Sequence, residues 1–203
     1  SAWTLLEDRL GTLWAGTLGG GVVRVRGGVF TRYGEKEGLP SEYAWALAED
    51  SSGTLWAGTD RGLARFDGTA FRTVPLPQPF ERPSIRSLLG DPSGGLWIGT
   101  AADGLLRWDG TSVSRVHPKE GGRVPGGVYA LAPWRGGVAA AFYGVGLVEA
   151  DTAGHVKVSG RSEGLPSDLL WSLHRDRNGA LWVGSDGGGL VRVSRDRVET
   201  LGA

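Results

Sequence analysis

Short apolar segments recur along the chain, each followed by glycine, aspartate or serine. The clearest of them pairs Leu with Trp between glycines and occurs as GTLWAGT (11–17), GTLWAGT (53–59), GGLWIGT (94–100) and GALWVGS (179–185). Trp14, Trp56 and Trp97 are spaced about 42 residues apart, and Trp182 lies two such periods further on. The pattern therefore predicts a repeat in which one copy, between Trp97 and Trp182, is degenerate.

Each repeat divides into four strand-like segments. In the best copy these are AWALAED (44–50), LWAGT (55–59), GLARF (62–66) and AFRTV (70–74). Residues that favour tight turns separate them, such as the Asp-Gly pair at 67–68, which is a strong hairpin signal. The sequence predicts five units at about 1–33, 43–74, 84–116, 127–158 and 169–201.

The degenerate copy is GGVAAAFYGVGLVEA (136–150), which places Ala139 where the other copies have Trp. This unit also lacks the aspartate that precedes the Leu-Trp segment elsewhere, at Asp8, Asp50, Asp91 and Asp176. We expect the unit to form, with packing against its neighbours that differs from the rest.

Four-stranded units with a period near 42 are typical of a β-propeller, because one such sheet cannot bury both faces alone. We therefore predict an all-β fold: a single β-propeller domain over residues 1–203, with five four-stranded blades of about 42 residues. The alternative is a fragment of a larger propeller. We expect the Trp of each copy to lie between adjacent blades, where it fills the widening space.

The segment EKEGLPSEYAWALAEDSSGTLWAGTDRGLARFDGTAF (35–71) resembles the two-component regulator propeller repeat. The matching elements are GLPS (38–41 and 164–167), the aspartate turn, G-x-LW-x-GT and G-L-x-R-F. The resemblance covers essentially the whole chain, and the fourth unit departs from it. It implies a periplasmic or extracellular sensor region of a bacterial hybrid histidine kinase or related regulator, several of which are associated with polysaccharide sensing. In that family the repeats usually build larger propellers.

Composition excludes several classes of function. Lys plus Arg and Asp plus Glu both number 22, so the chain has no net charge that would favour nucleic acid. There is no Cys, which excludes disulfides and thiolate metal sites, and the three His residues show no metal-ligand spacing. We find no apolar run long enough to span a membrane and no signal peptide. No cofactor or metal is expected.

Candidate ligand contacts lie at the start of the first strand of each unit, which lines the channel mouth in similar propellers. The second residue of that strand is Trp3, Trp45, Arg86, Tyr129 and Trp171. Aromatic and guanidinium groups around one opening are suited to sugar rings or to a protein partner. The alternative is that these side chains pack between blades like the other tryptophans.

Loops on the same side add two further candidates, Arg61 and Tyr143, from the segments between second and third strands. The loops before the third and fourth units, 75–84 and 117–127, are longer and rich in proline, which suits specificity. Arg24, Arg65, Arg107 and Arg192 share one third-strand position, which we interpret as an ion-pair or edge position and not as a ligand site.

The predicted function is non-enzymatic ligand sensing, in which a carbohydrate-like ligand or a protein binds at the channel mouth. A protein-interaction scaffold is the first alternative, and a polysaccharide lyase or hydrolase is the second. Catalysis has little support, because glycosidases need converging carboxylates and the nearest candidates, Glu42 and Asp168, belong to turns. We expect a monomer if five blades close a ring, and otherwise a dimer driven by open blade faces.

Overall fold

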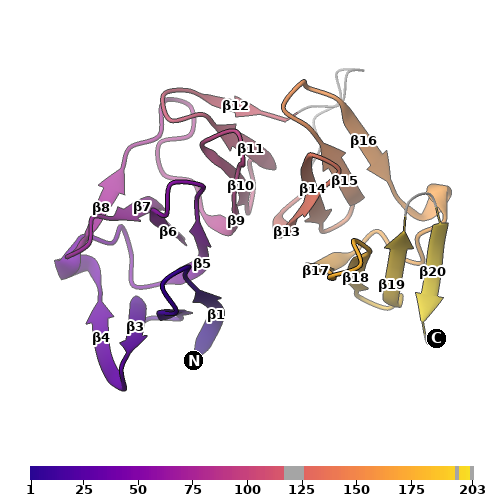
Figure 1. Ribbon diagram of the computed structural model, residues 1–203. Coiled ribbons are helices and arrows are strands. Elements are labelled where there is room, and N and C mark those ends of the chain that lie inside the picture. The colour runs from indigo at the N-terminus through magenta and orange to yellow at the C-terminus, as the bar shows by residue number, and fades with distance from the viewer. Residues whose placement is uncertain (117–125, 195–196, 202–203) are drawn as a thin grey trace. The chain divides into compact units, whose positions relative to one another are not determined.

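The computed structural model describes residues 1–116, 126–194 and 197–201 and contains five four-stranded sheets, each a simple antiparallel meander (Figure 1). By chain contacts the molecule divides into two compact units. Unit 1 comprises Ser1–Ile98 and Arg107–Ser114, and unit 2 comprises Gly99–Leu106 and Arg115–Ala203, so the boundary passes through the third sheet. The prediction of an all-β chain of five propeller blades is confirmed.

Unit 1 holds blades 1 and 2 and most of blade 3. Blade 1 consists of β1 (Ala2–Glu7), β2 (Leu13–Thr17), β3 (Val22–Arg26) and β4 (Val29–Tyr33). Blade 2 consists of β5 (Ala44–Glu49), β6 (Leu55–Thr59), β7 (Gly62–Phe66) and β8 (Phe71–Val74). Blade 3 consists of β9 (Ile85–Gly90), β10 (Leu96–Thr100), β11 (Leu105–Trp108) and β12 (Val113–Arg115).

Unit 2 holds blades 4 and 5. Blade 4 consists of β13 (Val128–Trp134), β14 (Gly137–Phe142), β15 (Gly146–Ala150) and β16 (Val156–Ser159). Blade 5 consists of β17 (Leu170–Arg175), β18 (Leu181–Ser185), β19 (Gly189–Ser194) and β20 (Arg197–Leu201). Two short 3-10 helices, η1 (Glu35–Glu37) and η2 (Arg161–Glu163), precede the two GLPS segments.

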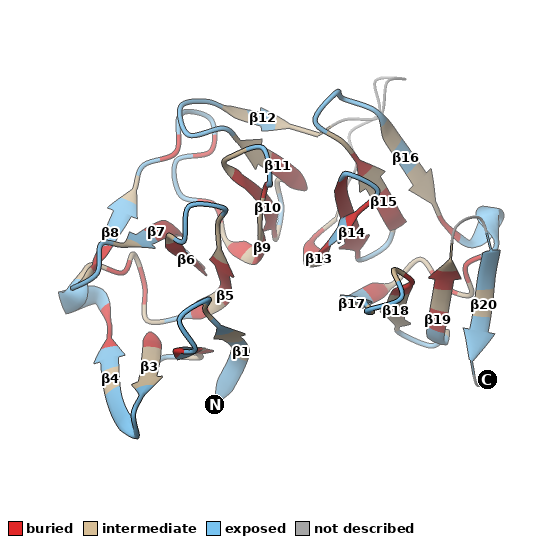
Figure 2. Ribbon diagram, in the orientation of Figure 1, coloured by how far each residue is buried: buried red, intermediate tan, exposed pale blue. Residues whose placement is uncertain are grey.

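The core of unit 1 lies between the facing sheets of blades 1 and 2. Trp14 of β2 is buried there, with its ring centroid 5.0 Å from that of Phe66 and 6.4 Å from that of Phe71, both on blade 2. The prediction that the repeated Trp packs between blades is therefore confirmed for Trp14. Figure 2 shows β6 and β10 buried and β1 and β4 largely exposed.

The glycine of the Leu-Trp-x-Gly segment allows neighbouring blades to approach closely. A Cβ atom on Gly16 would lie 2.7 Å from the carbonyl oxygen of Ala44 in blade 2, and one on Gly58 would overlap the side chain of Ile85 in blade 3. These contacts explain why only glycine, which has no Cβ atom, fits at this position.

Blade 4 packs its core with a tryptophan from a different position of the repeat. Trp134 occupies the position of the missing turn aspartate, while Ala139 stands at the usual Trp position, and both are buried in the core between blades 4 and 5. Glu149, at the position that is Arg in the other blades, accepts a hydrogen bond from Trp134 Nε1 at 2.8 Å. The indole thus lies at the position of the turn aspartate, and its acidic partner lies at the position of the third-strand arginine.

Candidate functional site

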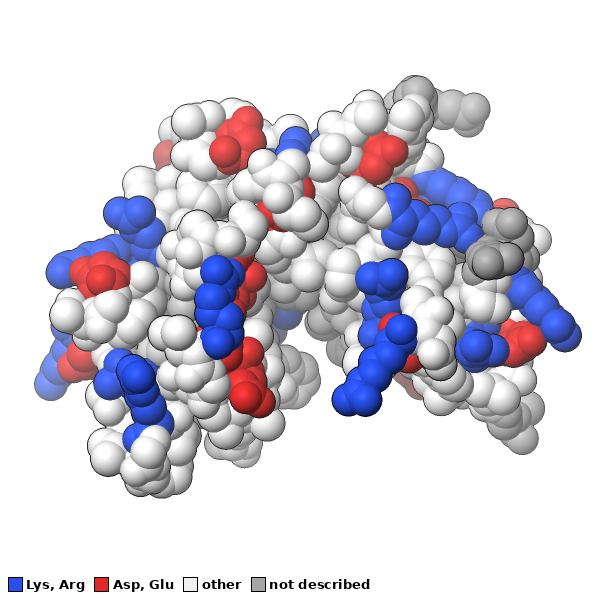
Figure 3. All heavy atoms as spheres, viewed as in Figure 1, with Lys and Arg blue, Asp and Glu red and all other residues white. Residues whose placement is uncertain are grey.

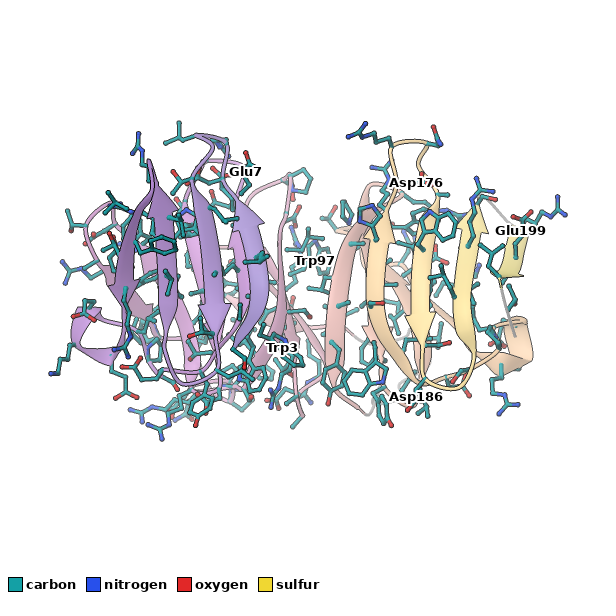
Figure 4. The ribbon with its side chains drawn as sticks, turned by 90° about the horizontal axis from the view of Figure 1, so that it is seen from below. Trp3, Glu7, Trp97, Asp176, Asp186 and Glu199 are labelled. Atoms are coloured by element: carbon teal, nitrogen blue, oxygen red, sulfur yellow. The ribbon has the colours of Figure 1, made fainter. Side chains whose placement is uncertain are left out.

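Each blade has two ends with different chemistry. We call the entry end the one where the first strand begins and where the loop between second and third strands lies, and the turn end the opposite one. In Figure 4, Trp3 marks the entry end of β1 and Glu7 its turn end, and in blade 5 Asp186 and Asp176 mark the entry and turn ends. The sequence-predicted contacts all lie at entry ends.

A β-bulge sets the direction of the candidate aromatic side chains. The ladder between first and second strands shifts register between Ala2 and Thr4, and the same shift recurs in the strand pairs of blades 2, 4 and 5. The residues left inside these four bulges are Trp3, Trp45, Tyr129 and Trp171. Bulges re-aim side chains and are common beside functional sites.

In unit 1 the structure brings together three of the predicted contacts. Trp3 packs edge-on against Trp45, with ring centroids 5.3 Å apart and planes at 84°. The guanidinium carbon of Arg86 lies over the Trp45 ring, 4.0 Å from its centroid. Trp3 is 56% exposed, and Trp45 and Arg86 are partly buried, so the group presents an indole and a cation to solvent.

In unit 2 the other three aromatic candidates form a second group. The Trp171 ring centroid lies 4.5 Å from that of Tyr129 and 5.0 Å from that of Tyr143, and the two tyrosine rings are 6.1 Å apart. Trp171 is 43% exposed, and Tyr143 is also exposed. The rings are tilted or edge-on to one another, the geometry that aromatic quadrupoles favour.

Tyr43, immediately before β5, was not singled out from the sequence. It is exposed and bridges to Leu18 of the loop between β2 and β3. Among the described residues the exposed aromatic side chains are Trp3, Phe30, Tyr43, Tyr143 and Trp171, and all except Phe30 lie at entry ends. The signal that could have found Tyr43 is its place directly before the first strand of the second unit.

Arg61 stands apart from the two aromatic groups. It lines a hollow of about 480 Å³ on blade 2, formed with Pro40, the end of β8 and the proline-rich loop at 75–84. Its guanidinium lies 3.8 Å from Glu35, and both side chains are more than half exposed, so the pair contributes little to stability. Arg61 is therefore free to turn toward a ligand. The other long loop, 117–127, lies mostly outside the described residues.

Two carboxylates considered for catalysis have structural partners. Glu42 accepts hydrogen bonds from Arg32 Nη2 at 2.9 Å and from the Glu35 amide at 3.1 Å. Asp168 accepts a hydrogen bond from the Arg161 amide at 2.7 Å. Each carboxylate thus holds the loop that enters the next blade, which agrees with their interpretation as turn residues.

A second hollow, of about 220 Å³, lies at the turn end of blade 4 beside Trp134. Its charged groups pair with one another: Glu149 lies 3.7 Å from Lys157, and Asp151 lies 2.8 Å from His155. Hydrogen bonds from the His155 side chain and backbone lower the pKa of Asp151. Because these charges are already matched, this hollow is a weaker candidate than the entry ends.

The face of the molecule in Figure 3 carries acidic and basic side chains side by side, with neither sign forming a continuous patch. Within the described ranges, no three His, Cys, Asp or Glu residues are grouped so that they could hold a metal ion. No helix in that part of the chain is long and apolar enough to cross a membrane.

Comparison with known proteins gives a family match. Residues 38–61, 80–102 and 164–187 match the family model described as the two-component regulator propeller. No curated protein matches the chain in sequence.

Solved structures agree on the fold. The extracellular domain assigned to a hybrid two-component system of B. thetaiotaomicron is 25% identical with a TM-score of 0.71, over 84% of this chain and 26% of that one. Virginiamycin B lyase from Staphylococcus aureus has a TM-score of 0.74 at 13% identity, over 97% of this chain and 68% of that one. PorZ, a surface component of the type-IX secretion system of Porphyromonas gingivalis, has a TM-score of 0.74 at 17% identity, over 98% of this chain and 33% of that one.

The chain spans about a quarter of the length of the first of these structures. Likeness to the lyase and to PorZ shows the fold alone, because their identities are low.

Proposed function

We propose that the chain, which matches the two-component regulator propeller family over three segments, is a non-enzymatic recognition module of the extracytoplasmic part of a bacterial signalling protein. Its ligand is an oligosaccharide that binds at the entry ends of the blades. Binding is passed on as a signal by segments outside these repeats. A periplasmic or extracellular location is supported by the extracellular domain of the two-component system that the chain resembles.

The observation that carries this proposal is the bulged aromatic position. A propeller needs large side chains between its blades, and Trp14 meets that need, because it is buried against Phe66 and Phe71 of blade 2. Trp3 and Trp171 do not, since both are exposed at entry ends. Leaving an indole about half exposed forgoes about 1 kcal/mol of burial, and a sugar ring stacked on it recovers part of that energy.

The test is a glycan array probed with the purified chain, followed by calorimetric titration of the best oligosaccharide. We expect Trp3→Ala and Trp171→Ala each to weaken binding about tenfold or more, as truncation of an aromatic anchor does. Phe30→Ala is the matched control, because Phe30 is an exposed aromatic at a turn end and its loss leaves affinity unchanged. Equal affinity for all four proteins would contradict the proposal.

A polysaccharide lyase or hydrolase is the alternative, and the likeness to virginiamycin B lyase does not support it, because that likeness shows the fold alone. The engagement of Glu42 and Asp168 in loop hydrogen bonds argues against a glycosidase pair. Chromatography of oligosaccharides incubated with the chain separates the two functions: recognition leaves them intact, and catalysis yields shorter products.

A further inference from the structure

We propose that the ligand of the unit 1 entry end is an acidic sugar, whose carboxylate is bound by Arg86 while its ring stacks on Trp3. This inference rests on the proposed function and adds the chemical class of the ligand. It is carried by one departure from the repeat. Where the other four blades place an aromatic residue, blade 3 places the cation Arg86.

Among the described residues, Arg86 has no acidic partner of the kind that a partly buried arginine usually has. Across the described part of the chain, no carboxylate lies within 4.0 Å of its guanidinium, and its Nε is buried without a hydrogen-bond partner. By contrast, Arg107 of the same blade pairs with Asp91 at 2.8 Å. A partly buried cation with a buried, unsatisfied Nε carries a desolvation cost, and a bound anion would offset part of it.

The position of Arg86 is held by the Trp45 indole. The 4.0 Å contact between the guanidinium carbon and the ring centroid is a close cation–π stack. A guanidinium stacked on an aromatic face can still use the edge that bears its two Nη groups to bind a ligand. Those two Nη groups can donate two parallel hydrogen bonds to a planar carboxylate. Trp45 is thus a positioning residue, and Arg86 is the group that touches the ligand.

The neighbouring surface matches the rest of a hexuronate. Trp3, in edge contact with Trp45 and 56% exposed, offers a face for the pyranose ring. Tyr43, exposed in the segment before β5, adds a phenolic hydroxyl at the same entry end. Ring, hydroxyl groups and carboxylate therefore each have a counterpart within blades 1 to 3 of unit 1.

The experiment is a calorimetric titration with tetragalacturonate and with its fully methyl-esterified form, which keeps the sugar rings and removes the charge. We expect the wild-type chain to bind the acid about tenfold more tightly than the ester, the difference that one charge-assisted bidentate contact supplies. Arg86→Gln removes this preference and leaves affinity for the ester unchanged. Arg86→Lys keeps the positive charge but cannot donate two parallel hydrogen bonds, so it retains only part of the preference for the acid.

Arg82→Gln is the matched control, because Arg82 is an exposed cation in the loop that leads into the same strand. If the preference came from the general charge of this loop, Arg82→Gln would lower it as much as Arg86→Gln, and the inference would be wrong. Equal affinity for acid and ester, or no binding of tetragalacturonate, also overturns it. If the ester binds through Trp3 without any preference for the acid, the acidic subsite fails while the proposed function stands.

Discussion

At the residue scale, the repeated turn aspartate is a hydrogen-bond centre. In blades 1, 2 and 5, one carboxylate oxygen accepts from two backbone amides of its own turn, and the other accepts from the indole of the following strand. In blade 3, Asp91 Oδ2 accepts from Arg107 Nε instead. The aspartate therefore ties the turn to the buried Trp or to the third strand, which explains its fixed spacing from both.

These contacts predict the acid sensitivity of the fold. Burial opposes ionisation of Asp50, but hydrogen bonds from Ser52, Trp56 and the Thr54 amide outweigh it and lower the pKa of the carboxyl below its ordinary 3.8. Since the folded-state pKa is depressed, this stabilisation is complete above about pH 4 and is lost as the pH falls through the folded-state pKa. We expect the melting temperature to be level from pH 7 to pH 5 and to fall below pH 4.

Replacing Asp50 by Ala tests the assignment. The loss of these acceptors lowers the free energy of unfolding at pH 7 by about 2 kcal/mol, and the fall in melting temperature below pH 4 becomes shallower. Thermal unfolding followed by circular dichroism measures both. An Asp50→Ala protein with the wild-type pH profile would show that other carboxyls control acid unfolding.

At the element scale, blade 4 shows that one packing problem has two solutions. The sequence places Ala139 correctly in the repeat, and its packing depends on Trp134, which reaches the core from the end of the first strand. Glu149 then serves as the acceptor that a turn aspartate provides elsewhere. The alignment of the copies could not predict this rearrangement, because it compares each position with its equivalents and not with its neighbours in space.

The rearrangement in blade 4 predicts the outcome of a reversion experiment. Glu149→Ala leaves the buried indole nitrogen of Trp134 without an acceptor and lowers the free energy of unfolding by about 2 kcal/mol. The triple variant Trp134→Asp, Ala139→Trp, Glu149→Arg rebuilds the arrangement of the other blades and regains most of the wild-type stability. Chemical denaturation measures all three proteins. A triple variant less stable than Glu149→Ala would contradict this account of blade 4.

The candidate site was predictable in part. The equivalent positions Trp3, Trp45, Arg86, Tyr129 and Trp171 follow from the repeat, but the bulge that aims four of them does not, because a shifted ladder leaves no mark in composition. That Arg86 has no carboxylate partner among the described residues depends on long-range contacts, which the sequence does not show. The ligand-binding roles of these residues, and of Arg61 and Tyr143, remain predictions.

At the scale of the whole molecule, one face of blade 1 differs from its equivalent in blade 2. Leu5 is 64% exposed where its counterpart Leu47 is 8% exposed, and Phe30 is 73% exposed where Phe71 is fully buried. In blade 2, Leu47 and Phe71 pack in one buried cluster with Trp14 of blade 1. The same kind of surface is thus a blade interface in one place and open to water in another.

This exposed face predicts association of the 203-residue chain in solution. We expect light scattering to show a mass that rises with concentration, since contiguous apolar patches of this kind mark interaction sites. Leu5→Ser with Phe30→Ser lowers that association, and the same substitutions at Leu47 and Phe71 unfold the protein instead. A monomer at all concentrations would contradict the prediction and agree with closure of the five blades into a ring.

The central claim is that the entry ends of the blades recognise an oligosaccharide, and the most direct test is to map where the ligand binds. An amide chemical-shift titration with the best oligosaccharide from the array reports on every blade at once. The account predicts shifts around Trp3, Trp45 and Arg86 in unit 1 and around Tyr129, Tyr143 and Trp171 in unit 2. Shifts confined to turn ends, near Phe30 or Trp134, would contradict it.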